Sequence, residues 1–225
     1  WQGVPDLPLT GRRIGLSVTL GDYPVSPEVR TNTEAVGEAL EAAGATVVPV
    51  RLPWTTARIR ETTFAHFGHI LGPAMQRETA GTEEHLARYT LRFMADARAA
   101  AERHCLPESL ALDARLQAEL AQAMTGLDAL LCPTSAVTAL DAEGDYLDGI
   151  DAGGRRLKHY WEAHLTSPFN VANRCPVLSV PSGVAANGVP TGVQVVGHPG
   201  DEATVFGIGA HIERLTPRRP WPGQG

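Results

Sequence analysis

Residues 166–202 place the tightest constraint on what this chain can fold into. Two apolar runs, Val177–Val180 and Val193–Val196, flank the dipeptide Asn187-Gly188. Asn-Gly between β-branched runs is typical of a β-hairpin, because both residues tolerate the positive φ that a tight two-residue turn requires. The pattern therefore predicts two antiparallel strands joined at this turn.

The residues on both sides of this hairpin support the same interpretation. Prolines stand at places where a central strand could not lose an N–H: Pro168, Pro176, Pro181 and Pro190. Downstream, Asp201 and Glu202 precede the apolar run Val205–Leu215. Acidic side chains suit the first turn of a helix, because the helix N-terminus carries a partial positive charge. We therefore expect strand, hairpin, strand and helix in that order.

The N-terminal region has the pattern of a strand–helix–strand unit. Arg13–Val18 and Thr46–Val50 are apolar strand candidates, and a helical pattern between them starts near Pro27 and stops at Gly44. Two strands joined through a helix over this length should be parallel. The turn at residues 19–22 lacks the Gly-rich fingerprint of a dinucleotide site, so we expect no nucleotide there.

The middle of the chain reads as helical from residue 54 to residue 124, with three or four helices. Breaks are expected near Gly72-Pro73, Gly81-Thr82 and Pro107. A short apolar strand, Ala129–Cys132, follows. The predicted fold class is α/β, a mixed β-sheet flanked by helices with a helical insert between strands. We expect one α/β domain over residues 1–225, with the helical excursion at about 54–125.

Three shorter segments receive simpler assignments. Residues 136–154 are acidic and contain glycine, which predicts a loop. Lys158–Leu165 is expected to form a short helix. The Pro-, Gly- and Arg-rich residues 216–225 are expected to fray.

Bulk composition excludes several function classes. The net charge of −6 and pI near 5.7 provide no electrostatic footprint for nucleic acid. No apolar run has the length of a membrane span, and no secretory signal is visible. The three cysteines form no C-x-x-C pair, which favours reduced structural thiols and a cytoplasmic setting. Four arginines are interpreted as a solvated helical face: Arg88, Arg92, Arg98 and Arg103.

Two sequence patterns are similar to metal-binding motifs, but each lacks residues that its motif requires. His66 and His69 could share a helix face, but a zinc site needs a further ligand and no His-Glu-x-x-His motif is present. The acidic run starting at Asp141 lacks the glycine of a calcium loop, because Tyr146 occupies that place, and lacks its closing acid at Ala152. We expect no metal and no organic cofactor.

The ordered set of short motifs resembles the C-terminal part of the amidase signature family. The resemblance is carried by Asp128-Ala-Leu-Leu-Cys-Pro-Thr134, Asn170, Pro176, Val180-Pro-Ser-Gly183, Gly188-Val-Pro190, Gly192-Val-Gln194, Gly197 and Asp201-Glu202. Residues Leu9-Thr-Gly-Arg-Arg-Ile-Gly15 resemble the segment that directly follows the family's catalytic core. The resemblance implies a parent enzyme that hydrolyses a carboxylic amide through a serine acyl-enzyme.

The catalytic residues of that family do not carry over. The resemblance implies a Ser–cis-Ser–Lys triad on a Gly/Ser-rich run, and this chain has no such run. Its nearest paired glycines are Gly153-Gly154, its single lysine is Lys158, and Ser182 lies in a Pro-Ser-Gly turn. We therefore expect no catalytic residue in this chain, which would be a C-terminal portion lying downstream of the catalytic core. It would meet its small-molecule amide substrate through the parent enzyme, with an N-terminal catalytic half or another chain as partner.

The segment before the hairpin supplies the candidate substrate-binding residues. The resemblance implies that residues 160–170 border the acyl-substrate pocket, and the candidates there are Trp161, His164, Thr166 and Asn170. Trp and His combine an apolar body with a polar handle, which suits a pocket wall. The alternative is that Trp161 anchors the core and Asn170 braces backbone. For the whole chain, the alternative function is a non-catalytic interaction subunit or pseudo-enzyme fragment that docks to another chain.

Overall fold

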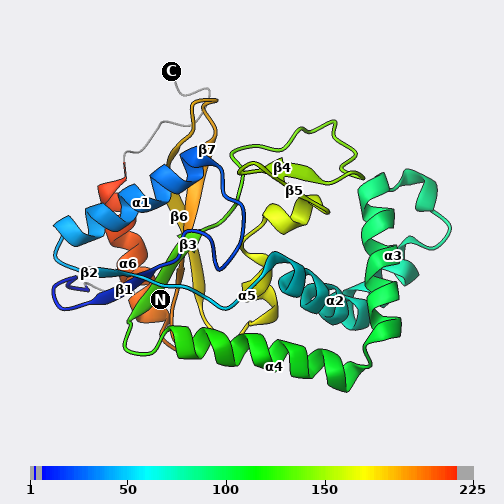
Figure 1. The fold of residues 1–225 in the computed structure, drawn as a ribbon, viewed down its shortest axis with the longest axis horizontal. Helices are drawn as coiled ribbons and strands as arrows, with labels where there is room; N and C mark the ends of the chain where they lie inside the picture. The colour runs from blue at the N-terminus through cyan, green and yellow to red at the C-terminus, as the bar shows by residue number, and fades with distance from the viewer. Residues whose placement is uncertain (1–2, 4–6, 217–225) are drawn as a thin grey trace.

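The computed structural model describes residue 3 and residues 7–216, and Figure 1 shows the fold. In chain order the elements are β1 Arg13–Leu16, α1 Pro27–Ala42, β2 Thr46–Pro49, α2 Thr56–Thr79, the 3-10 turn η1 Glu83–His85, α3 Arg88–Arg103, α4 Leu106–Ala123, β3 Ala129–Pro133, β4 Ile150–Ala152, β5 Arg155–Leu157, the 3-10 turn η2 Tyr160–Ala163, α5 Ser167–Val171, β6 Val177–Val184, β7 Pro190–Val196 and α6 Glu202–Leu215. The frayed tail predicted for 216–225 falls almost entirely outside the described residues.

The main sheet is mixed, as the sequence predicts. Its five strands lie in the order β2-β1-β3-β7-β6. β1 is parallel to both β2 and β3, which confirms the strand–helix–strand unit, and β7 is antiparallel to both β3 and β6. The hairpin at Asn187-Gly188 is confirmed, but residues 185–189 connect its strands, and of the two turn residues only Gly188 has positive φ, +83°. Pro181 is tolerated because β6 is an edge strand and the register shifts between Pro181 and Gly183.

Helices cover the two faces of this sheet unequally. α1 and α6 share one face, where Ile14, Leu131 and Val195 pack with Leu40 and Ile208. A larger core lies on the opposite face beneath α2, α4 and α5. The α2–α3 pair then extends away from the sheet, to the right in Figure 1. This excursion places helical side chains opposite the η2–α5 segment.

The predicted helix break at Gly72-Pro73 is wrong. α2 runs without interruption through Pro73 to Thr79, even though proline removes one helical hydrogen bond. Close packing against α3 supports the helix here: a Cβ built on Gly68 would lie 2.3 Å from the Ala97 carbonyl oxygen. Pro73 itself is exposed, so its ring meets solvent. The expected breaks near Gly81 and Pro107 agree with the structure.

Three local assignments also need correction. The predicted loop 136–154 contains strand β4, which pairs with β5 across the Gly153-Gly154 turn, where both glycines have positive φ. The helix expected over Lys158–Leu165 is only the 3-10 turn η2, Tyr160–Ala163. Ser182 lies inside strand β6, not in a turn, because the strand continues past Pro181 through the bulge.

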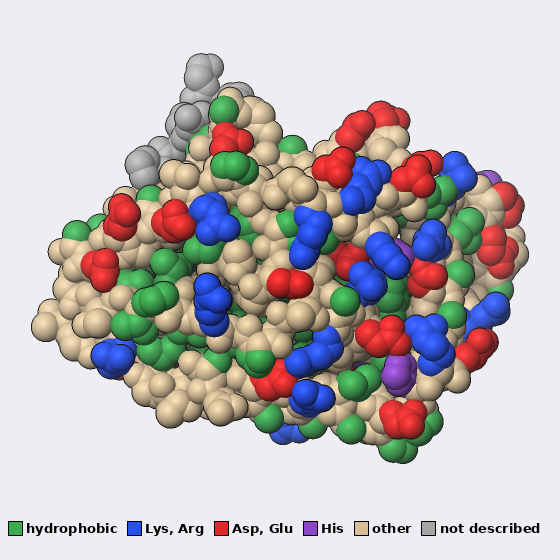
Figure 2. Space-filling view, viewed as in Figure 1, with side chains coloured by type: hydrophobic (Ala, Val, Ile, Leu, Met, Phe, Trp, Pro, Cys, Tyr) green, Lys and Arg blue, Asp and Glu red, His purple; other side chains and the backbone are tan. Residues whose placement is uncertain are grey.

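Charge is spread over the helical excursion without a dominant sign. Figure 2 shows basic and acidic side chains interspersed over α2 and α3. Exposed ion pairs there include Arg98–Glu102 and Arg103–Glu61. Within residue 3 and residues 7–216, no helix has the length and apolarity that crossing a bilayer requires.

Candidate functional site

The η2–α5 segment is held in place by backbone bonds to the chain leaving β3. The Leu165 N–H donates to the Thr134 carbonyl at 3.0 Å, and the Ala136 N–H donates to the Ala163 carbonyl at 2.7 Å. Gln194 on β7, buried at 1% exposure, adds two side-chain bonds. Its Nε2 donates to the carbonyls of Pro133 at 2.9 Å and Leu165 at 3.1 Å. The segment is therefore fixed against the sheet, and its side chains have defined directions.

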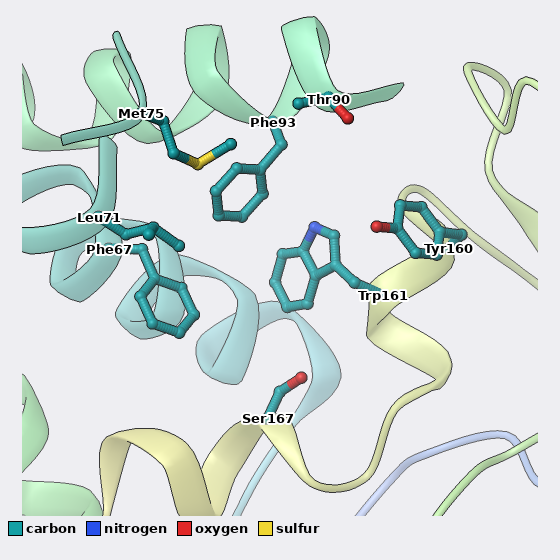
Figure 3. Close-up of a pocket in the computed structure, with 8 residues that line it drawn as sticks. All are labelled: Phe67, Leu71, Met75, Thr90, Phe93, Tyr160, Trp161 and Ser167. Atoms are coloured by element: carbon teal, nitrogen blue, oxygen red, sulfur yellow. The ribbon is translucent and has the colours of Figure 1, made fainter. Parts of the chain in front are cut away.

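One side of this segment faces an apolar cavity of about 260 Å³. It is lined by Phe67, Leu71 and Met75 of α2, Thr90 and Phe93 of α3, Tyr160 and Trp161 of η2, and Ser167 of α5. Figure 3 shows the Trp161 indole projecting between the two helices and η2, with Ser167 below it and Tyr160 beside it. We call this space the aromatic cavity. None of these eight lining residues carries a charge.

The ring of Trp161 packs against two neighbouring rings, but its indole N–H makes no hydrogen bond to any described residue. Its ring meets Phe64 edge-on at 5.0 Å between centroids and stacks with His159 at 5.8 Å. The side chain is 8% exposed, and the indole nitrogen Nε1 is buried with no hydrogen-bond partner in the described part of the chain. Buried indole N–H groups usually find an acceptor, so this one is exceptional.

The other side of the segment faces a polar hollow of about 330 Å³. It is lined by Thr166, Phe169, Asn170, Asn173, Cys175, Val177, Ser179 and Gln194. Val177 and Ser179 come from edge strand β6 and are exposed. Amide and hydroxyl groups therefore gather over the end of the sheet, next to α5.

Consecutive residues separate the two spaces. Ser167 lines the aromatic cavity and Thr166 lines the polar hollow. Of the four residues predicted from sequence, Trp161 belongs to the cavity, whereas Thr166 and Asn170 belong to the hollow. His164 lines neither; its backbone bridges Ser135, and burial lowers the pKa of its imidazole.

The helical half of the cavity wall cannot be recognised from sequence. Phe67 and Phe93 lie on helices that are far from Trp161 in the sequence and meet it only in the fold. Gln194 belongs to the Gly192-Val-Gln194 motif, which by itself assigns it no role. A glutamine that alternates with valines in a buried strand does indicate that its side chain holds a neighbouring segment in place, because a buried amide must find hydrogen-bond partners.

The residue that follows Trp161, Glu162, forms a buried ion pair with Arg60. Glu162 is 2% exposed, accepts from Arg60 Nη1 at 2.8 Å through Oε1, and accepts from the His159 N–H at 2.8 Å through Oε2. Burial lowers the pKa of the His159 imidazole, with Glu162 and Asp96 acting in the opposite direction. The Glu162 carboxylate fixes η2 and thus the indole.

The hydrogen bonds of the serine hydroxyls bear on the prediction that this chain holds no catalytic residue. Within residue 3 and 7–216, no hydrogen bond joins a serine hydroxyl to a histidine or to Lys158, which is exposed. Ser182 is buried and bonded to Thr191 at 2.9 Å. His66 is bonded to Asp113 at 2.6 Å, but no cluster of three or more metal-ligating side chains occurs in these ranges.

Comparison with known proteins identifies the fold and the family. The family described as Amidase matches residues 7–206. A subunit of the glutamyl-tRNA(Gln) amidotransferase of Thermosynechococcus vestitus is 30% identical over 95% of this chain and 47% of its own length. A bacterial aryl acylamidase of the amidase signature family has a TM-score of 0.78 at 19% identity, covering 92% of this chain and 44% of that one. Another solved amidase has a TM-score of 0.77 at 24% identity, over 94% and 47%.

The chain belongs to the amidase signature family. The α/β fold with its mixed sheet matches the structures of that family. The chain spans about half the length of the curated relatives that it matches, 47% and 44% for two of them.

Proposed function

We propose that this chain frames the substrate side of an amide hydrolase. The nucleophile and base would come from a separate segment, in the same polypeptide or in another chain. The reaction would convert a carboxylic amide into an acid and ammonia or an amine through a serine acyl-enzyme. The observation that carries the proposal is a built pair of hollows beside α5 with no activated serine next to them in the described residues.

The sheet offers a place for the segment that the proposal requires. One face of β6 packs on α6, where a Cβ on Gly209 would lie 2.4 Å from Leu178 Cδ2. On the opposite face Val177, Ser179 and Pro181 are exposed, and β6 has no partner on its outer edge within the described chain. An unpaired edge beside an exposed face is a template for added structure. It adjoins the polar hollow, so an added segment would bring its groups there.

The family supports the chemistry, and the relatives' names support a partner. The Thermosynechococcus relative is named as one subunit of an amidotransferase, which fits a chain that works in a larger assembly. A second candidate function follows from the same name: a non-catalytic interaction subunit that docks to another chain. We also propose a cytoplasmic setting, because all three cysteines are free.

Active-site labelling tests the proposal. The purified chain should give no turnover of benzamide and no labelling by a fluorophosphonate. Co-expression with a Gly/Ser-rich segment from the parent reading frame should restore both, with the label on that segment. A Ser→Ala change at the labelled position provides the matched control. Labelling of Ser182 or of any other serine in this chain would overturn the proposal, and a stable but inactive complex would favour the interaction subunit.

A further inference from the structure

The aromatic cavity has the composition of a site for an uncharged ligand. Five of its eight lining residues are apolar or aromatic side chains without a hydroxyl group, and Thr90, Tyr160 and Ser167 add hydroxyl groups. A charged group entering such a space would lose its hydration without gaining a charged partner. The cavity therefore selects against carboxylates and ammonium groups.

The volume of the cavity suits one ring with a small substituent. Apolar cavities of about 150 Å³ in proteins hold a benzene molecule. The cavity here measures about 260 Å³. The rings of Phe67, Phe93 and Trp161 surround it, and offset or edge-on contacts between aromatic rings are favourable.

One polar atom in the wall has a missing partner. Nε1 of Trp161 is a donor only, is buried, and has no acceptor among the described residues. In Figure 3 it lies on the edge of the indole that faces α3. The nitrogen has no exposed surface, so a ligand acceptor would reach it after a small movement of a wall side chain. Such a bond would satisfy a donor that folding leaves unpaired.

The cavity and the polar hollow lie on opposite sides of the η2–α5 segment but border consecutive residues of it. Ser167 lines the cavity, and the preceding residue, Thr166, lines the polar hollow. A ligand whose ring occupies the cavity can direct its other end toward α5. This connection rests on the proposed function, whereas occupation of the cavity itself does not.

We propose that the aromatic cavity binds the uncharged aromatic end of an amide substrate, with an oxygen acceptor on the ring bonded to Trp161 Nε1–H. The substrate class is thus aryl amides carrying a neutral acceptor on the ring remote from the amide. Ring contacts supply the affinity, and the indole supplies the preference for the acceptor.

Two ligands of matched shape test this bond. The probes are 4-acetylbenzamide, which has a ketone acceptor, and 4-isopropylbenzamide, which does not. Affinities for both probes are measured by titration calorimetry in the wild type and in Trp161→Phe. In ¹⁵N-labelled wild type, the indole N–H signal of Trp161, assigned by its loss in Trp161→Phe, reports contact at the nitrogen. A neutral hydrogen bond changes affinity by roughly three- to tenfold. We expect the acetyl compound to bind tighter by that factor in the wild type and the preference to vanish in Trp161→Phe.

Blocking the cavity provides an independent measurement. Leu71 lines the cavity and is 40% exposed, so Leu71→Trp should fill it without disturbing the core and abolish binding of both probes. Leu91 has similar exposure, 38%, but does not line the cavity, so Leu91→Trp should leave binding unchanged. Equal affinities for the two probes in the wild type, or the same preference in Trp161→Phe, would overturn the inference. Because binding is read without turnover, these results are independent of whether amide hydrolysis is observed.

Discussion

Arg60 Nη1 lies 2.8 Å from Glu162 Oε1, and this ion pair joins the excursion helix α2 to η2. The Glu162 side chain is 1% exposed and that of Arg60 is 24% exposed. A carboxylate buried to this extent is tolerable only with its partners in place. The pair therefore joins α2 to η2, the elements that contribute Phe67 and Trp161 to the lining of the aromatic cavity.

Removing the cation should destabilise the protein strongly. Arg60→Met keeps the length of the side chain but leaves Glu162 buried and unpaired, and we expect a loss of about 3 kcal/mol in the free energy of unfolding. Urea denaturation gives the value. Arg98→Met breaks an exposed pair on α3 and should change stability by no more than about 0.5 kcal/mol. Equal effects of the two variants would show that the buried pair has no special role.

A second prediction concerns the glutamine that fixes the α5 segment. Gln194→Leu leaves the carbonyls of Pro133 and Leu165 without their side-chain donor, and should cost about 2 kcal/mol in unfolding free energy. Gln117→Leu is the control, because its side chain is only partly buried and makes weak bonds: Nε2 donates to the Cys175 sulfur at 3.5 Å, and Oε1 accepts from the Arg174 N–H at 3.4 Å. Thermal denaturation of both variants compares them; a smaller loss in Gln194→Leu than in the control would contradict the assigned role.

Stability should fall as the pH drops below about 6.5. Burial lowers the pKa of His164 and of His159 in the folded state. At a pH between the folded and the unfolded pKa of either histidine, the unfolded chain therefore binds more protons than the folded one. The contribution is fully present above the unfolded pKa and is lost as pH falls toward the folded pKa. Each histidine adds a slope of at most about 1.4 kcal/mol per pH unit. Urea midpoints at pH 7.5 and pH 5.5 measure it.

The histidine variants identify the source of this pH dependence. His164→Gln should flatten the profile, because the neutral amide does not titrate. His85→Gln changes a side chain that is 78% exposed and should leave the profile as in the wild type. A profile unchanged by His164→Gln would assign the slope to other groups.

The cysteines should differ sharply in reactivity. Cys132 is fully buried in β3, and burial raises the pKa of its thiol, so almost no thiolate forms at pH 8. Cys105 is exposed at the start of α4. We expect a disulfide reagent to modify Cys105 rapidly and Cys132 only after denaturation. Cys105→Ser should remove the rapid phase; a rapid phase that persists and labels Cys132 would contradict the buried position.

Local sequence was sufficient for the elements whose pattern agrees with their packing. Asn187-Gly188 predicted the β6–β7 hairpin, and Asp201 and Glu202 predicted the start of α6, where Asp201 caps the Thr204 N–H. Pro73 shows where such reasoning stops. Its effect on α2 is overridden by the contact of Gly68 with α3, which no local pattern contains.

For the candidate site, too, one part could be predicted from the sequence and another part could not. The sequence by itself determined the family and the mixed sheet, because those features are written in short ordered motifs. The substrate-binding role of Trp161, Thr166 and Asn170 stays a prediction. Only the tertiary structure decided that Trp161 faces one space and Thr166 another, and that Phe67 and Phe93 complete the first. The physical reason is that a cavity is formed by surfaces from distant parts of the chain, whose distance in space is set by the packing of α2 and α3 against η2.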